Sequence, residues 1–281
     1  MIKIGITGAN GMLGYDLSNL LARKNNYEVH LFDLPKFDIT NKNNLEKIVH
    51  SSDIIINCAA YTAVDNAETD SNRCYAVNAA ATEILGKLAA KFKKYLIHVS
   101  TDFVFGDNSS EPLTEMSKTN PLSVYGQSKL EGEQLLSNTT AKSSIIRVQW
   151  TYGKHGNNFI SKILTLADKF DSLNVVNDQF GSPTHTIDAA KAILCFIKKQ
   201  PEGLFHFASK DYTSRYETAK LICRTLKIKT EIKPCTSDKF PTPASRPKNS
   251  RFDCSKIDAI LDFKRPLWQD SLKTFLLKNY F

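Results

Sequence analysis

The sequence predicts an α/β protein built on a doubly wound parallel sheet. Through the first half of the chain, short apolar segments that suit strands alternate with amphipathic segments that suit helices. A glycine-rich turn, GANGMLG, directly follows the first of these strands, and polar residues follow several of the others. Alternating strands and helices form parallel sheets covered by helices on both faces, and strands this apolar fit burial between two helical layers.

The first half supplies most of the predicted sheet. We expect strands at 3–7, 28–32, 53–57, 95–100 and 144–148, and helices near 12–24, 43–50, 71–91 and 124–137. After about residue 150 the pattern loosens. There we expect helices at 158–170, 185–199, 214–226 and 267–279, with short strands near 173–176 and 204–208.

The chain is long enough for one main domain and a smaller companion. We expect residues 1–150 to form a nucleotide-binding domain of Rossmann type. Residues 151–281 then form mainly a smaller C-terminal α/β lobe, with some segments returning to the Rossmann core, and the family resemblance given below implies that this is the substrate-binding lobe. The stretch 235–253 is rich in Pro and Ser, which disfavours long regular structure, and it predicts an ordered loop or lid of the smaller lobe.

Composition excludes several classes of protein. The chain has 281 residues, of which 42% are hydrophobic and 23% charged, and no apolar run is long enough to span a bilayer. Six scattered cysteines without metal-ligand spacing, and an N-terminus that enters a strand pattern directly, predict a cytoplasmic protein with reduced thiols. The net charge of +8 suits a solvated surface and also favours an anionic substrate. No nucleic-acid-binding motif accompanies this charge, so we expect no nucleic-acid partner. Asp16 and Asp188 are separate carboxylates rather than a cluster of ligands, so we expect no required metal.

The glycine-rich turn predicts a dinucleotide site. Gly8, Gly11 and Gly14 lie between the first strand and the first helix. In that context, a turn without side chains lets backbone N–H groups approach a pyrophosphate, and the helix N-terminus favours its negative charge. The alternative is an unoccupied tight turn.

Two residues after the second strand bear on the choice of coenzyme. Asp33 ends that strand, where a carboxylate accepts hydrogen bonds from the adenine ribose and favours NADH. Lys36 follows closely and can pair with the 2′-phosphate of NADPH, so both coenzymes stay open. Ala59 and Ala60 follow the third strand at its carboxyl end and are small enough for a cofactor to lie close.

We predict that Tyr125 and Lys129 form a catalytic pair. They lie four residues apart and share one face of a helix, so the lysine ammonium can favour the ionised tyrosine and make the phenol a proton donor near neutral pH. Ser100 and Thr101 end the fourth strand, where a hydroxyl can hydrogen-bond a reacting carbonyl. Asn78 is expected to support its neighbouring helix or a water chain to Lys129.

These motifs together resemble the extended short-chain dehydrogenase/reductase superfamily. The segments NCAAYTAVDNAE, VSTDFVF, VYGQSKLEGE, RVQWTYG, NDQFGSPT and PTPASRPKNSR are similar, in that order, to the dTDP-4-dehydrorhamnose reductase family. The resemblance runs through nearly the whole chain. It implies hydride transfer from NADPH or NADH to C4 of a 4-keto-6-deoxy sugar nucleotide, in a cytoplasmic monomer or homodimer. One departure is FGDN at 105–108, where many relatives have Phe-Asp-Gly.

The resemblance also implies roles for residues. The catalytic residues are Thr101, Tyr125 and Lys129. The cofactor-binding residues are Gly8, Asn10, Gly11, Met12, Leu13, Gly14, Asp33, Asp38, Ala59, Ala60, Tyr61, Tyr125 and Lys129. The substrate-binding residues are Thr101, Asp102, Phe103, Trp150, Arg246 and Arg251, where the two arginines anchor a diphosphate or instead form surface ion pairs.

Two other functions fit the same motifs. A sibling reductase or epimerase of another keto-sugar nucleotide would keep every one of them. A noncatalytic, NADP-binding regulatory subunit would keep the fold, although the presence of Thr101, Tyr125 and Lys129 favours an enzyme.

Overall fold

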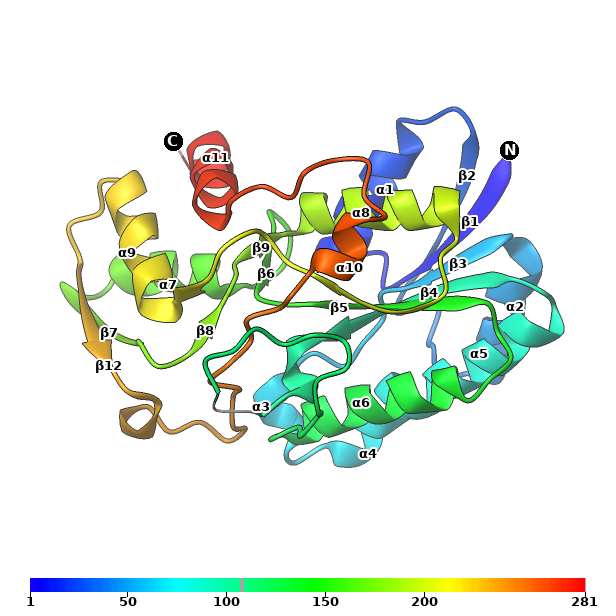
Figure 1. Ribbon diagram of the computed structural model, residues 1–281, viewed down its shortest axis with the longest axis horizontal. Helices are drawn as coiled ribbons and strands as arrows, with labels where there is room; N and C mark the ends of the chain where they lie inside the picture. Colours follow the sequence, from blue (N-terminus) through cyan, green and yellow to red (C-terminus); the bar gives the residue numbers. More distant parts are fainter. Residues whose placement is uncertain (107–108, 281) are drawn as a thin grey trace.

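The centre of the fold is a six-stranded parallel sheet in the order β10-β5-β4-β3-β1-β2 (Figure 1). The computed structural model describes residues 1–106 and 109–280. The strands of this sheet are β1 (Ile2–Thr7), β2 (Tyr27–Phe32), β3 (Ile54–Asn57), β4 (Tyr95–Thr101), β5 (Ser143–Val148) and β10 (Gly203–Phe207). The strand order reverses between β1 and β3, and in doubly wound sheets ligands bind outside the carboxyl ends of the strands at such a point.

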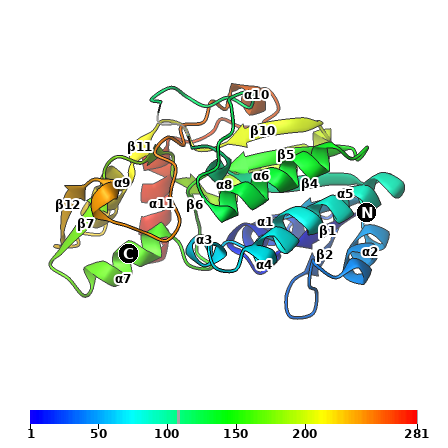
Figure 2. The same ribbon diagram turned by 90° about the horizontal axis from the view of Figure 1, so that it is seen from below.

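Helices cover both faces of the sheet (Figures 1 and 2). One face carries α1 (Met12–Ala22) and α8 (Thr186–Lys199), whose apolar side chains join those of the strands in one buried cluster. The opposite face carries α2 (Lys42–Ser51), α5 (Ala81–Lys91) and α6 (Val124–Ser137), which build a second cluster. These two layers explain why the central strands are apolar on both sides.

A third apolar cluster lies in the second half of the chain, beside the carboxyl ends of the strands. It is built from α7 (Phe159–Ala167), α9 (Arg215–Thr225), α11 (Trp268–Tyr280) and the parallel pair β7 (Ser172–Val176) and β12 (Glu231–Cys235). The remaining short strands are β6 (Thr151–Tyr152), β8 (Phe180–Gly181), β9 (Thr184–His185) and β11 (Thr213–Ser214). The remaining short helices are α3 (Val64–Ala67), α4 (Ser71–Tyr75), η1 (Ala76–Ala80), η2 (Asp102–Val104), η3 (Ser237–Lys239) and α10 (Ser255–Asp258).

The predicted elements of the first half are confirmed within one or two residues at most ends, and helix 124–137 has the predicted bounds. The helical stretch predicted at 71–91 is confirmed in its bounds, but a π-helical segment that was not predicted, η1, lies within it between α4 and α5. The strand β12 was not predicted. Its side chains alternate weakly and it contains Pro234, so the segment lacks the sequence signal of a strand. The stretch 235–253 holds little regular structure, as predicted.

Candidate active site

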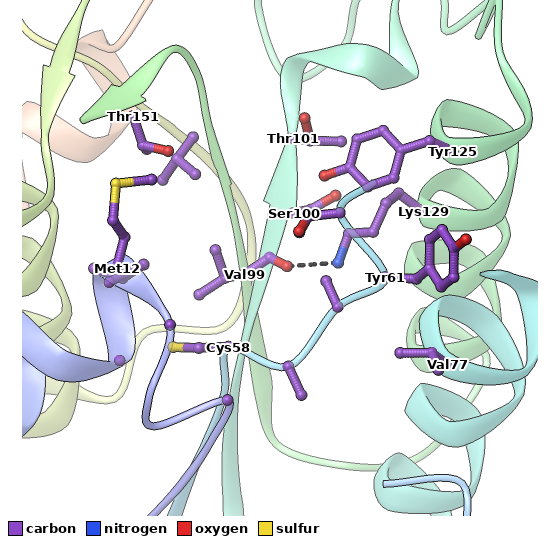
Figure 3. A pocket seen from close by; sticks show the side chains of 18 of the residues that line it. Met12, Cys58, Tyr61, Val77, Val99, Ser100, Thr101, Tyr125, Lys129 and Thr151 are labelled. Atoms are coloured by element: carbon purple, nitrogen blue, oxygen red, sulfur yellow. Dashed lines mark hydrogen bonds between the residues drawn. The ribbon is translucent and has the colours of Figure 1, made fainter. Parts of the chain in front are cut away.

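A cavity of about 750 Å³ opens at the carboxyl ends of β1, β3 and β4, at the point where the strand order reverses. Figure 3 shows its wall near α6. Every predicted cofactor-binding residue lines it, and so do the predicted catalytic residues and four of the six predicted substrate-binding residues. Residues far apart in the sequence therefore meet in one continuous pocket that runs from the glycine turn to Tyr125.

The glycine turn lines the pocket at the start of α1. Its backbone lies so close to neighbouring backbone that Gly8 and Gly14 have no room for a side chain. Gly8 has a φ of +63°, and a Cβ there would lie 2.6 Å from the backbone nitrogen of Ala59. A Cβ on Gly14 would lie 2.8 Å from the Cα of Ala9. Gly11 caps the N-terminus of α1. These contacts fit a turn that presents backbone N–H groups and a helix N-terminus to a pyrophosphate.

The end of β2 places one acid and one arginine at the edge of the pocket. The Asp33 carboxylate accepts hydrogen bonds from the backbone N–H groups of Asn10 and Leu34, both at 2.7 Å. Lys36, which sequence reasoning offered as a partner for a 2′-phosphate, is exposed and is not part of the lining. The basic residue of the lining there is Arg73 of α4, which donates to the Asp38 carboxylate at 2.9 Å. Sequence reasoning missed Arg73 because its position depends on the fold of α4.

Asn78 fixes the loop that follows β3 by hydrogen bonds. The side-chain oxygen of Asn78 accepts from the backbone N–H of Tyr61 at 2.9 Å, and its amide donates to the Tyr61 carbonyl at 3.3 Å. The amide also donates to Ser128 of α6 at 2.9 Å. Asn78 therefore ties the small residues of this loop, Ala59 and Ala60, to the helix that carries Tyr125, which supports the first of its two predicted roles.

Tyr125 and Thr101 face the same part of the pocket (Figure 3). Both are buried, and the Thr101 side chain lies close enough to act on the Tyr125 hydroxyl, while its own hydroxyl donates to the Asp102 carboxylate at 3.2 Å. Burial raises the pKa of Tyr125, the Asp102 carboxylate adds to the rise, and Thr101 opposes it. The predicted lowering of the pKa of this phenol is therefore wrong for this arrangement. A neutral phenol with a raised pKa still carries the proton that a general acid must deliver.

Lys129 lies on the same face of α6 but points to the sheet. Its Nζ donates to the carbonyl oxygen of Val99 at 2.7 Å, drawn as a dashed line in Figure 3, and lies 3.1 Å from Nε2 of His98. Burial lowers the pKa of Lys129 to about 8, and the charge of Glu133 opposes that shift. His98 is a member of the site that sequence reasoning missed, since an isolated histidine inside an apolar strand gives no signal of its partner.

The far wall of the pocket is built around Trp150. Its backbone has a φ of +45°, an unusual conformation for a bulky residue that is often found at functional sites. The guanidinium of Arg215 lies 3.6 Å from the centre of the Trp150 ring and also lines the pocket. Burial lowers the pKa of Arg215 to about 10, and the charge of Asp102 opposes the shift. Sequence reasoning missed Arg215, which stands at the start of α9.

Asp102 and Phe103 follow Thr101 in the short helix η2. The Asp102 carboxylate is buried and accepts a hydrogen bond from Ser250 at 2.6 Å, and burial raises its pKa. The Phe103 ring packs edge-on against Tyr125 at 5.3 Å between centres. Both residues shape the wall beside the catalytic tyrosine.

Arg246 and Arg251 lie outside the residues that line the cavity. Arg246 forms a two-pronged ion pair with the Asp65 carboxylate, at 2.7 and 2.8 Å. The Arg251 guanidinium lies 4.2 Å from the centre of the Phe180 ring. The positive charge of Arg246 nevertheless contributes, after burial, to the lowered pKa of Arg215, which does line the pocket.

Among the described residues, no group of three or more His, Cys, Asp or Glu side chains could hold a metal ion. The Asp16 carboxylate accepts a hydrogen bond from Thr186, and Asp188 pairs with Lys191 at 2.8 Å. All six cysteines are free thiols. No helix in the described part of the chain is long and apolar enough to cross a bilayer. In the FGDN segment, Asp107 and Asn108 lie outside the described residues.

Comparison with known proteins gives consistent matches over the full chain. The model of the RmlD substrate binding domain family matches residues 2–280. A dTDP-4-dehydrorhamnose reductase of Aggregatibacter actinomycetemcomitans is 38% identical, over 97% of this chain and 98% of the relative. The crystal structure of a dTDP-4-dehydrorhamnose reductase of Clostridium acetobutylicum is 38% identical with a TM-score of 0.94, over 99% of both chains. That of Bacillus anthracis, solved in complex with NADP, is 33% identical with a TM-score of 0.92, also over 99% of both chains.

Proposed function

Because the chain belongs to the dTDP-4-dehydrorhamnose reductase family, we propose that it reduces the C4 ketone of dTDP-4-dehydrorhamnose to dTDP-L-rhamnose, with NADPH or NADH as the reductant. The observation that carries this proposal is the continuous pocket between the glycine turn and the pair Thr101 and Tyr125. A dinucleotide that enters at Gly8 and Gly14 has room to extend along the pocket to these hydroxyls. The Bacillus anthracis relative was solved with NADP, which agrees with that use of the pocket.

The side chains divide the work of reduction between them. The bound coenzyme supplies a hydride to the ketone carbon. Tyr125 gives its phenolic proton to the ketone oxygen, and Thr101 donates a hydrogen bond to the same atom, which stabilises the charge that develops there. We assign to the Lys129 ammonium, which lines the pocket, the binding of ribose hydroxyls of the nicotinamide half of the coenzyme. Burial of Tyr125 keeps its proton in place until the substrate oxygen receives it.

The second half of the chain is proposed to bind most of the sugar nucleotide. Residues 1–150 then hold the coenzyme, and 151–281 hold mainly the substrate while also contributing β10 to the central sheet. Trp150 offers an aromatic wall to the sugar. Arg215 already faces the pocket, and Arg246 and Arg251 remain our proposed diphosphate anchors because guanidinium groups match phosphate oxygens in pairs. For Arg246, this requires the Asp65 ion pair to open.

We place the reaction in the cytoplasm, where nicotinamide coenzymes and nucleotide sugars are available, in a monomer or homodimer. Six free thiols agree with a reducing compartment. Cell fractionation and analytical ultracentrifugation test these two statements.

The decisive experiment measures oxidation of NADPH and of NADH at 340 nm, an absorbance band of the reduced nicotinamide, with dTDP-4-dehydrorhamnose as substrate. Consumption of coenzyme together with formation of dTDP-L-rhamnose is the expected result. Activity with other keto-sugar nucleotides alone would favour a sibling reductase, and inversion of a stereocentre without coenzyme consumption would favour an epimerase. Coenzyme binding without turnover on any of them would favour a regulatory subunit.

A further inference from the structure

We propose that His98 is a positioning residue that fixes the direction and the protonation of the Lys129 ammonium. The inference rests on the proposed function, because Lys129 matters only if the pocket binds a nicotinamide coenzyme. Lys129 is the first member of a buried row of side chains, and the other members have no role in the proposed reduction. The row runs from Lys129 on α6 through His98 on β4 and Asn57 on β3 to Thr7 on β1.

The row lies in the protein interior, and only its Lys129 end lines the pocket. Lys129 is 1% exposed, and His98, Asn57 and Thr7 are each fully buried. Successive distances are 3.1 Å from Lys129 Nζ to His98 Nε2, 3.0 Å from His98 Nδ1 to Asn57 Nδ2, and 2.7 Å from the Thr7 hydroxyl to Asn57 Oδ1, which accepts from it. Because His98, Asn57 and Thr7 are fully buried, their polar atoms depend on their neighbours in the row.

His98 and Val99 together fix the orientation of the Lys129 ammonium. An ammonium has three N–H bonds. The Val99 carbonyl takes one at 2.7 Å, and an unprotonated Nε2 on His98 takes a second at 3.1 Å. The third is then left to face the pocket, where a ribose hydroxyl can accept it. Without His98, the ammonium would lose one of the two contacts that fix its orientation.

The protonation of His98 is restricted by its neighbours. A charged imidazolium would place a second positive charge 3.1 Å from Lys129 in a buried site, so the ring is neutral. A neutral ring that accepts from Lys129 through Nε2 carries its hydrogen on Nδ1, which requires the oxygen of the Asn57 amide to face it. In the structure the amide nitrogen of Asn57 faces His98 Nδ1 and its oxygen accepts from Thr7, so this tautomer requires a half-turn of the amide, which exchanges oxygen and nitrogen in the same two places. Without that half-turn the ring hydrogen would lie on Nε2, which would require an uncharged Lys129. The row therefore couples the charge of Lys129 to the tautomer of His98, and we assign the ammonium with the Nδ1–H tautomer as the working state.

Other titratable groups also face Lys129. Glu133 lies one turn along α6, but Arg147 pairs with it at 2.6 Å. Cys58 and Cys74 approach from β3 and α4, and burial raises the pKa of both thiols, which keeps them uncharged. Tyr125 is also held neutral by burial. Of these titratable side chains, His98 is the one whose ring contacts the ammonium directly, beside the backbone carbonyl of Val99.

The test compares His98→Phe, which removes both ring nitrogens, with His98→Gln, which can keep an acceptor near Nε2. His206→Phe is the matched control, because His206 is a fully buried histidine of β10, which is separated from β4 by β5, and bonds to the Leu113 carbonyl away from the pocket. We expect His98→Phe to weaken coenzyme binding about tenfold, the worth of one hydrogen bond to a charged group. We expect the fall of kcat at alkaline pH to begin about one pH unit lower, because the ammonium loses a stabilising acceptor. His98→Gln should restore much of both, and His206→Phe should change neither.

An unchanged pH profile and coenzyme affinity in folded His98→Phe would overturn the inference, as would equal shifts in His206→Phe. If His98→Phe fails to fold, the wild-type protein decides by ¹⁵N NMR of its histidine rings, with His98 assigned from His98→Gln. A neutral Nδ1–H tautomer at pH 7 is expected, and an Nε2–H tautomer or an imidazolium would contradict it. This measurement and coenzyme titration need no sugar substrate. The role of His98 can therefore be disproved while the proposed reaction stands, and the proposed reaction can be disproved while the role of His98 stands.

Discussion

Tyr125 and Lys129 share one face of α6, yet their titratable atoms have different neighbours. The phenol faces Thr101 and the pocket, whereas the ammonium is held against β4 by Val99 and His98. Burial shifts the two pKa values in opposite directions, up for the phenol and down for the ammonium, because it disfavours the charged form of each. In the mechanism we propose, the tyrosine is therefore a proton donor by position rather than by acidity.

Replacing Tyr125 by Phe tests that assignment. We expect kcat to fall by roughly 10² or more, the worth of a positioned general acid, because the ring remains and the proton does not. Coenzyme affinity should stay near that of the wild type, and fluorescence titration of NADPH measures it. Ser123→Ala, which removes the hydroxyl that caps α6, is the control for a general disturbance of the helix. Wild-type turnover in Tyr125→Phe would remove this residue from the mechanism.

We propose that Asp33 governs the choice of coenzyme at the other end of the pocket. Its carboxylate is oriented by the Asn10 and Leu34 backbone N–H groups and would repel the 2′-phosphate of NADPH. We therefore expect Asp33→Asn to shift the ratio of the two kcat/KM values toward NADPH about tenfold. Arg73→Ala should shift it toward NADH if the 2′-phosphate draws Arg73 away from Asp38. A ratio that does not move in Asp33→Asn would contradict this account.

Residues with a sequence motif were predictable, and those placed by the fold were not. Tyr125, Lys129 and the glycines stand in patterns whose spacing has a physical meaning, and the structure brings them to one pocket. His98, Arg73 and Arg215 have no such pattern. Their positions follow from the pairing of strands and the packing of helices, which sequence periodicity does not report.

The π-helical turn η1 is the element whose geometry most affects the site. It places Asn78 fully inside the protein. There its side chain hydrogen-bonds the backbone N–H and the carbonyl oxygen of Tyr61, and also the Ser128 hydroxyl. Single π-turns within α-helices are common at functional sites. Sequence periodicity predicted one continuous helix over 71–91 because an extra residue in a turn hardly changes the apolar pattern over that length.

Asn78→Ala tests the link between this turn and the pocket. The change leaves the backbone N–H of Tyr61 without its partner, so we expect a loss of about 1–3 kcal/mol in the free energy of unfolding. We also expect coenzyme affinity to fall, because the loop of Ala59 and Ala60 loses its tie to α6. Thr82→Val is the matched control, since its hydroxyl bonds the Asn78 carbonyl within the same helical stretch and does not contact the loop. Denaturant unfolding and coenzyme titration of both variants would separate the two effects, and equal loss of affinity in both would contradict the link.

At the scale of the whole molecule, two layers of helices make the sheet interior a poor environment for charge. His98 and His206 lie on strands of that sheet, both fully buried. Burial lowers the pKa of His98 well below its usual value and that of His206 to about 3. Folding therefore requires both rings to be neutral, which ties the stability of the entire fold to pH.

The resulting pH dependence has a definite sign. Between pH 6.5 and the lowered native pKa, the unfolded chain binds a proton on each histidine and the native protein does not, so the free energy of unfolding falls as pH falls. At pH 5, which is 1.5 units below the unfolded value, the loss from His206 is about 2 kcal/mol, and the lowered pKa of His98 adds to it. Denaturant unfolding at pH 8 and pH 5 measures the sum. His206→Gln should reduce that difference by about 2 kcal/mol, whereas substitution of His50, which is exposed on α2, should leave it unchanged. Equal pH dependence in wild type and His206→Gln would show that the sheet interior tolerates a charged ring.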